Sequence, residues 1–384
     1  MATMCYRVSA TLVAATPLHI GSGLRTGVIK RSLGHIPGSV LRGAVGTSII
    51  KSVCRLDHPM VDHENCEHFG DCTYTALFGE EFGKASNVFF RYAYPLHLKC
   101  GGIYQPAPKT LYVCKDPQCK RTYDKVLPPI KCDCREDIEP FTGYQCERCH
   151  ETEKHPTGFS RTTSTALDRR TASGAEISGN GESFGTLHTV ETIGKGSRFA
   201  VEVLVSRDCG DCVDVLKASL ERGLEDEGIG GGKSRGLGKV KVEGLRVEDV
   251  SQDSVHRRAA EIDVSCFSVR LVSPMLLEGK LLDSSSLLEG CRRSYAWLLH
   301  EGKPRLPDIE LKSKRIESET FSGWSLKTQK RRRIEPALSG GSVFQFGSSV
   351  KDETLALGLA ALEYHAIGDY KPHGCGQVRI ESCR

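Results

Sequence analysis

The stretch that decides the fold is Ile229-Gly-Gly-Gly-Lys-Ser-Arg-Gly-Leu-Gly-Lys-Val240, because its pattern returns as Ile367-Gly-Asp-Tyr-Lys-Pro-His-Gly-Cys-Gly-Gln-Val378. Isoleucine, glycine, lysine, glycine, glycine and valine recur in the same order at the same spacing. Each copy follows an apolar, helix-like run and precedes an alternating strand. A strand, a helix, a glycine loop and a strand that occur twice predict a duplicated α+β domain.

The glycine loops suit a polyanion. Closely spaced glycines let the backbone adopt positive φ, so that several N–H groups can point at one anion. Basic side chains accompany both copies. The loop residues that we expect to contact RNA are Gly230, Lys233, Arg235 and Gly236 in the first copy, and Gly368, Lys371, His373 and Gly374 in the second.

Nucleoside-phosphate loops do not fit this pattern. A P-loop needs a glycine where this chain has Glu227, and both the P-loop and the dinucleotide fingerprint place a helix, not a strand, after the glycines. The stretch from Arg235 keeps the basic-Gly-x-Gly start of the RNA-binding strand of RRM domains but lacks its aromatic residues. Binding to the RNA backbone is therefore favoured over base stacking, and a glycine turn without a ligand is the alternative.

Composition sets further bounds. With 52 Lys+Arg against 48 Asp+Glu in 384 residues, nucleic-acid binding must use local patches. The chain has no apolar run long enough for a membrane span and no signal peptide, so we expect a cytoplasmic protein with no membrane partner. A first domain over residues 1–250 and a second over 251–384 account for the duplication.

The cysteines indicate a structural metal. Most of the 17 cysteines cluster in an insertion over about residues 54–160, where apolar periodicity is lost. Two pairs on short knuckles suit tetrahedral Zn²⁺ with no open position, and Cys132 and Cys134 compete with them as ligands. The expected zinc ligands are Cys114, Cys119, Cys146 and Cys149, and a second possible site comprises Cys54, His58, Cys66 and Cys72.

Several motifs together resemble the RAMP superfamily of CRISPR effector subunits. They are Thr16-Pro-Leu-His-Ile-Gly-Ser-Gly23, His35-Ile-Pro-Gly-Ser-Val-Leu-Arg-Gly43, Ala76-Leu-Phe-Gly79, Thr165-Ala-Leu-Asp-Arg-Arg-Thr171 and both glycine loops. The resemblance implies two tandem ferredoxin-like, RRM-like domains of α+β class, each with a C-terminal glycine-rich loop, plus the zinc-binding insertion in the first. Within the superfamily, the chain looks most like the Csx-ten group, the Cas-five-like subunit of type III-D complexes.

The resemblance also implies function. It implies a cytoplasmic, prokaryotic subunit that holds the 5′ repeat-derived tag of the CRISPR RNA and caps the backbone filament in antiviral defence. Its partners would be other RAMP backbone subunits, the large polymerase-like subunit and the small subunit, with target RNA contacted indirectly. The RNA-facing residues implied are His19, Gly21, Ser22, Gly38, Ser39 and Arg42, together with Arg169 and Arg170 of a thumb-like segment over about residues 161–195.

We expect no catalytic residues. Cleaving members of the superfamily use an aspartate in the loop after the first strand, and here the segment from Gly21 to His35 contains no Asp or Glu. Nor does the sequence bring together a general acid and base. Asp168 beside two arginines is the weak candidate, so the alternative is an endoribonuclease, either a backbone subunit that cleaves target RNA or a precursor-processing enzyme.

Overall fold

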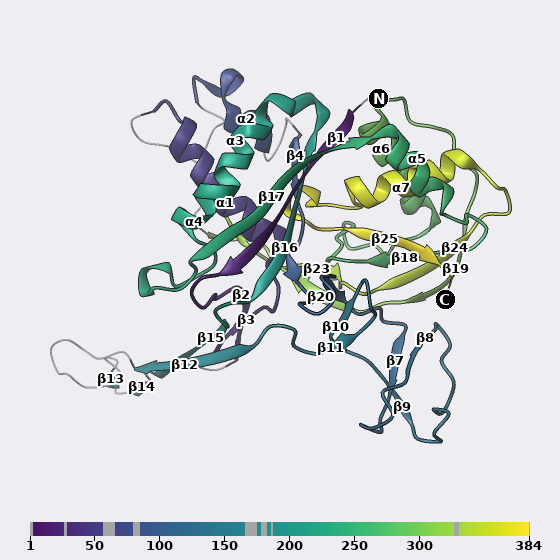
Figure 1. The fold of residues 1–384 in the computed structure, drawn as a ribbon, viewed down its shortest axis with the longest axis horizontal. Helices are drawn as coiled ribbons and strands as arrows, with labels where there is room; N and C mark the ends of the chain where they lie inside the picture. Colours follow the sequence, from purple (N-terminus) through teal and green to yellow (C-terminus); the bar gives the residue numbers. More distant parts are fainter. Residues whose placement is uncertain are drawn as a thin grey trace.

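The computed structural model describes residues 3–26, 29–56, 66–79, 85–165, 175–177, 183–185, 187–325 and 330–383. Two sheets lie beside each other with their helices packed on them, and the insertion and a long ribbon extend away from both (Figure 1). Among the described residues, no helix is long and apolar enough to cross a membrane.

The first sheet has the ferredoxin-like strand order. Its strands, in spatial order, are β17 (Val240–Ser251), β1 (Thr3–Ala14), β16 (Arg198–Ser206) and β4 (Val88–Phe90). Helix α1 (Gly38–Val53) lies between β1 and β4 in the chain, and α3 (Val213–Ala218) and α4 (Leu224–Glu227) lie between β16 and β17. Strand β1 is antiparallel to both of its neighbours.

The second sheet repeats this topology. Its strands, in spatial order, are β25 (Val378–Ser382), β18 (Phe267–Leu271), β24 (Val343–Gly347) and β19 (Glu310–Arg315). Helix α6 (Ser284–Leu299) follows β18, and α7 (Glu353–His365) joins β24 to β25. Helix α5 (Gln252–Ala260) leads into this domain and packs on α7. The expected fold class, two ferredoxin-like α+β domains, is confirmed.

The two glycine loops share one backbone conformation. Positive φ occurs at Gly228, Gly230, Gly232, Gly236 and Gly238 in the first copy, and at Ala366, Gly368, Tyr370, Gly374 and Gly376 in the second. In both copies the isoleucine N–H donates to the carbonyl of the last of these residues at 2.9 Å. Each loop also binds the turn after its domain's first strand, since Gly238 donates to Pro17 and Gly376 to Pro274.

Apolar periodicity explains the cores. In α7, Leu355, Leu359 and Leu362 lie on one face and are fully buried against β18 and β24. Asp352 caps this helix by accepting from the Leu355 N–H at 2.6 Å. The first core follows the same logic, with Leu41, Val45 and Ile49 of α1 packed on the sheet.

The insertion begins later than expected. Residues 88–90 form β4, the fourth strand of the first sheet, and β5 (Tyr94–Pro95) also pairs with β16. A fully buried strand of three residues shows no alternation, so its sequence resembles loop. Beyond β5 the insertion forms two small sheets: β6 (Tyr104–Pro106) with β10 (Tyr144–Cys146) and β11 (Thr152–Glu153), and β7 (Leu111–Cys114) with β8 (Thr122–Asp124) and β9 (Ile138–Pro140).

Two β-ribbons complete the chain. In the thumb-like segment, β12 (Phe159–Thr165) pairs with β15 (Leu187–Ile193). The other edge of β15 pairs with β3 (Ile29–Ser32), which pairs in turn with β2 (Gly21–Thr26). A separate pair is formed by β13 (Ala175–Ile177) and β14 (Ser183–Gly185). A second ribbon, here called the 318–338 arm, is built from β20 (Ser318–Phe321), β21 (Trp324–Ser325), β22 (Lys330–Arg331) and β23 (Glu335–Leu338).

A further covalent link lies in the second domain. Cys266 and Cys383 form a disulfide that joins the residue before β18 to the end of β25. The expectation of metal ligands concerned the cysteines clustered in the insertion. Cys266 and Cys383 lie outside it, so their disulfide is a separate feature that the sequence analysis did not predict.

Candidate nucleic-acid interface and metal sites

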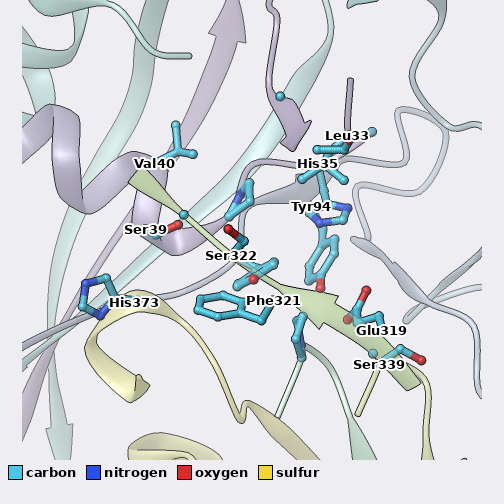
Figure 2. Close-up of a pocket in the computed structure, with 18 of the residues that line it drawn as sticks. Leu33, His35, Ser39, Val40, Tyr94, Glu319, Phe321, Ser322, Ser339 and His373 are labelled. Carbon is cyan, nitrogen blue, oxygen red and sulfur yellow. The ribbon is translucent and has the colours of Figure 1, made fainter. Parts of the chain in front are cut away.

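A cleft of about 2470 Å³ lies between the two domains. The first domain contributes the start of α1 and the first glycine loop, the second contributes the 318–338 arm and the second glycine loop, and the insertion contributes Phe141 and Tyr144. Figure 2 shows Ser39, His35, Phe321 and His373 around this space. The expected RNA-facing residues that line the cleft are Gly21, Ser22, Ser39, Arg42, Gly230, Lys233 and His373.

The first glycine loop presents its basic residues to solvent. Lys233–Arg235 form a single 3₁₀ turn between two left-handed glycines, Gly232 and Gly236, and the side chains of this turn are exposed. Burial of its stem, opposed by Glu227, lowers the pKa of Lys233. A Cβ on Gly230 would lie 2.4 Å from the His19 carbonyl oxygen, so glycine is required there. This loop is available to a phosphate backbone.

The turn after β1 is held beneath this loop. His19 Nδ1 donates to the Glu191 carbonyl oxygen at 2.8 Å, and its backbone bridges to Gly231. Ser22 donates to the Arg31 carbonyl oxygen at 3.4 Å. Gly21 and Ser22 line the cleft. His19 does not line it, and its side chain instead holds the turn to β15.

The start of α1 is a packing junction. The helix begins after Pro37 without a side-chain cap. A Cβ on Gly38 would lie 2.5 Å from the Phe90 oxygen and 2.6 Å from the His373 oxygen, so glycine permits close packing of the two domains. Ser39 points toward the cleft (Figure 2).

Arg42 is engaged within the first domain. Its guanidinium donates to the Phe78 carbonyl oxygen at 2.9 Å and to Ser86 Oγ at 3.3 Å, and it lies over the Phe78 ring at 4.6 Å. Burial lowers its pKa to about 10. A contact with RNA stays a prediction for this residue, and its evident role is to fix α2 (Thr73–Phe78) against α1.

The second glycine loop packs against the first domain. Lys371 Nζ lies 3.1 Å from His365 Nε2, and burial lowers the pKa of Lys371 to about 8. Burial, followed by the charges of Arg42 and Arg332, holds the pKa of His373 well below its usual range. A Cβ on Gly374 would lie 2.7 Å from the Phe90 oxygen. The two loops thus share a backbone but differ in accessibility.

The remaining arginine candidates and one metal candidate are not described by the structure. Arg169, Arg170 and Asp168 lie outside the described residues, as does His58. On the described part of the thumb-like ribbon, Arg161 Nε pairs with Glu191 at 3.0 Å. Within the described residues, Cys54, Cys66 and Cys72 do not form a group of three ligands.

The insertion contains two clusters of side chains that could hold a metal ion. In the first, Cys114, Cys119, Cys132 and Cys134 bring their sulfur atoms within 4.8 Å of one another. Cys114 and Cys134 are 3.4 Å apart, and Cys119 and Cys132 are 3.6 Å apart. These separations are close to the sulfur–sulfur edge of about 3.8 Å expected for a tetrahedron with metal–sulfur bonds of about 2.3 Å. This cluster fits Zn²⁺.

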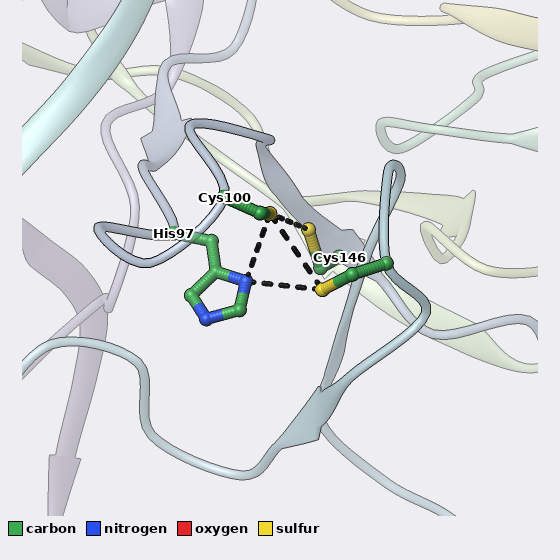
Figure 3. Close-up of side chains that lie close together, drawn as sticks. His97, Cys100 and Cys146 are labelled. Carbon is green, nitrogen blue, oxygen red and sulfur yellow. Dashed lines mark hydrogen bonds between the residues drawn. The ribbon is translucent and has the colours of Figure 1, made fainter.

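The second cluster comprises His97, Cys100, Cys146 and Cys149. His97 Nδ1 lies 3.2 Å from the sulfurs of Cys100 and Cys149, and Cys100 lies 3.4 Å from Cys146 (Figure 3). The other ring nitrogen of His97 is 3.4 Å from Glu151, the arrangement by which carboxylates orient metal-binding imidazoles. The Gly102 N–H donates to Cys100 Sγ at 3.4 Å.

The expected grouping of ligands is corrected by these clusters. Cys114 and Cys119 belong to one cluster, and Cys146 and Cys149 belong to the other. The hairpin of β7 and β8 brings Cys132 and Cys134 back to the first pair, and β10 runs beside β6 to meet His97 and Cys100. The sequence carried the missing signal, because His97-x2-Cys100 has the same knuckle spacing as Cys146-x2-Cys149.

The sequence also gave no indication of the arm's place in the cleft. Glu319 and Phe321 of β20 line the cleft opposite α1. Burial, opposed by Lys109 and reinforced by Glu317, raises the pKa of Glu319 to about 7. Trp324 at the arm's tip is 60% exposed. Local sequence in this segment is polar and basic, which is typical of a solvated loop.

The chain is similar in sequence to one protein family and in structure to solved chains. The sequence profile of the RAMP superfamily matches residues 11–241. No curated protein matches the chain. A similar solved chain comes from the "Cryo-EM structure of the Type III-B Cmr-beta bound to cognate target RNA", with a TM-score of 0.33 and 16% identity. The similarity covers 65% of this chain and spans 62% of the length of that one.

Proposed function

Because the chain belongs to the RAMP superfamily, we propose that it is an RNA-binding subunit of a type III CRISPR effector complex. The observation that carries the proposal is the first glycine loop, whose Lys233 is exposed at a cleft between two ferredoxin-like domains and whose Arg235 is exposed on the same turn. Exposed basic side chains suit a phosphate chain. The N–H groups of Gly231, Arg235 and Gly236 donate to backbone carbonyl oxygens, so the proposal rests on the side-chain cations.

The more specific role follows from the resemblance to the Csx-ten group. We propose that the cleft holds the 5′ repeat-derived tag of the CRISPR RNA and that the chain caps the backbone filament in antiviral defence. Other RAMP subunits, the large polymerase-like subunit and the small subunit would then contact its outer surfaces. The residues assigned to the RNA backbone are Gly21, Ser22, Ser39, Lys233 and Arg235.

Zinc is proposed as a structural cofactor at both clusters. Four thiolates, or three thiolates and an imidazole, fill a tetrahedral ion and leave no position for a substrate. The insertion has only small apolar clusters of its own, such as Ala107, Leu111 and Phe141. Metal binding would therefore supply its folding free energy.

We propose that the chain does not cleave RNA itself. The support is the absence of Asp or Glu from residues 21–35, the segment in which cleaving superfamily members carry their aspartate. The alternative, an endoribonuclease that uses Asp168, makes a distinct prediction: Asp168→Ala would abolish cleavage by the assembled complex. Under the proposal, that variant leaves cleavage intact.

Replacement of the loop cations tests the binding role. The double variant Lys233→Ala/Arg235→Ala should bind single-stranded RNAs of different sequence more weakly by a similar factor. Its plot of log affinity against log salt should be less steep by about 1.4, since each lost phosphate contact on a single strand contributes about 0.7. Fluorescence anisotropy over a salt series measures both quantities.

The matched control is Lys217→Ala/Arg222→Ala, which removes two exposed cations at positions that do not line the cleft. This control should retain wild-type affinity and salt dependence. Equal behaviour of the two double variants would contradict the proposed role of the first glycine loop.

A further inference from the structure

One strand of the 318–338 arm places a carboxylate and an aromatic ring side by side in the cleft. Side chains alternate along a strand, so Glu319 and Phe321 emerge from the same face of β20, two residues apart. Both line the cleft. Figure 2 shows Glu319 beside Tyr94, with the Phe321 ring between Glu319 and His373 in the view.

The carboxylate of Glu319 has spare capacity as an acceptor. Its side chain is accessible from the cleft, and the backbone N–H of Gly340 donates to it. Within the described residues it has no ion-pair partner, because Lys109 pairs with Glu317. A carboxylate offers about four lone-pair positions, so most of its capacity faces the cleft.

The phenols around Glu319 do not use that capacity. Tyr94 donates to the Val272 carbonyl oxygen at 2.5 Å, Tyr144 bonds His35 Nδ1 at 2.9 Å, and Tyr92 bonds Cys375. The titratable and charged groups that face Glu319 are therefore Lys109, Glu317, Tyr92, Tyr94, Tyr144 and Cys375. An acceptor surrounded by occupied donors favours a ligand that brings its own N–H groups.

Phe321 supplies an adjacent flat surface. Its ring packs at 5.4 Å from Tyr370, and the Arg332 guanidinium lies over Tyr370 at 5.9 Å. Arg331 and Arg332 of the same arm also line the cleft. An aromatic ring beside cations is the arrangement on which unstacked bases of single-stranded RNA settle.

We propose that Glu319 and Phe321 form a guanine-reading pocket for one unstacked nucleotide of the bound RNA. This inference rests on the proposed RNA-binding function and adds base selectivity to it. Phe321 stacks on the base, and the two carboxylate oxygens accept from guanine N1–H and N2–H. Guanine alone among the four bases presents two adjacent donors on its Watson–Crick edge, so a bidentate carboxylate selects it.

Short RNAs provide the test. The full chain is titrated with fluorescent oligouridine that carries one central guanosine, adenosine, cytidine or inosine. The guanosine RNA should bind about tenfold more tightly than the others, the factor that a bidentate base contact provides. Inosine keeps N1–H but lacks the amino group, so its RNA should lose most of this gain.

Two variants assign the effect. Glu319→Gln should abolish the guanosine preference while affinity for oligouridine is retained, because the amide has one acceptor oxygen and its NH2 group would face a guanine donor. Glu139→Gln is the matched control, since Glu139 also lines the cleft but is not among the charged groups that face Glu319, and it should keep the preference. Protonation of Glu319 should likewise erase the preference as pH falls below about 7.

The outcomes separate the two claims. Equal affinity of the wild-type chain for all four bases, with salt-dependent RNA binding intact, would overturn the guanine pocket and leave the proposed function standing. A preference that persists in Glu319→Gln would overturn the assignment to this carboxylate. Failure of the wild-type chain to bind any RNA would overturn the proposed function and this inference with it.

Discussion

At the scale of a single residue, the protonation of Glu319 affects the stability of the folded chain. Its pKa in the folded chain is about 7, above its ordinary value of 4.5, because burial in the cleft disfavours the charged form. Between these values the folded state binds a proton that the unfolded state has released. Its contribution to stability is therefore best below about pH 4.5, declines as pH rises to about 7, and is unfavourable above that.

Glu319→Gln should accordingly stabilise the chain at alkaline pH. The gain should be absent near pH 4.5 and reach on the order of 1 kcal/mol at pH 8, a value reduced from the full shift because cleft water screens the carboxylate. Thermal denaturation of wild type and variant across this pH range measures it. A stabilisation that is independent of pH would show that the charge of Glu319 is not its cause.

The conformations of several individual residues could not be predicted from the sequence. All positive-φ positions of the first loop are glycines, so the sequence predicts them. The second copy has Ala366 and Tyr370 at two of the equivalent positions, and the sequence does not predict positive φ there. Lys371 turns onto His365 of α7 in its own domain, and His373 lies where the second loop packs on the first domain. No local sequence pattern encodes either contact. Likewise, only the structure shows that the side chains of Lys233 and Arg235 are exposed.

At the scale of elements, the cysteine-rich insertion shows how strand pairing decides which candidate ligands meet. Spacing along the chain identified the cysteine knuckles, and the pairing of β6 with β10 and of β7 with β8 assigned them to two clusters. Helices and long strands with clear periodicity were predictable, since one face of each is buried. The three-residue strand β4 was not, because it is buried throughout.

Gly102→Ala should disrupt one cluster and spare the other. A Cβ at this position would lie 2.7 Å from Cys146 Sγ and 2.9 Å from Arg148 Cβ, so the His97 cluster could not keep its geometry. Metal analysis of the purified chain should find two zinc ions in wild type and about one in the variant.

Gly158→Ala is the matched control, because a Cβ there meets no atom within 4 Å. It should retain both ions. Loss of both ions from Gly102→Ala would show that the clusters fold as one unit, and a folded wild-type chain without metal would refute the zinc assignment.

At the scale of the whole molecule, the two domains share one topology and one glycine-loop conformation, but their loops lie in different surroundings. The first glycine loop faces solvent at the cleft, and the second packs on α1 and β4 and joins the domains. The insertion and the 318–338 arm then close the cleft from the other sides. The first loop is therefore accessible at the cleft, and the second is part of the contact between the domains.

The most direct test of guide binding is to purify the chain together with the proteins encoded beside it and to sequence the RNA that accompanies them. If the chain holds the guide, the RNA should form a population with one shared, short 5′ end followed by variable segments, which is the signature of a held repeat-derived tag. Lys233→Ala/Arg235→Ala should reduce the yield of that RNA. Heterogeneous RNA without a common 5′ end, or no RNA at all, would contradict the proposed role in guide binding.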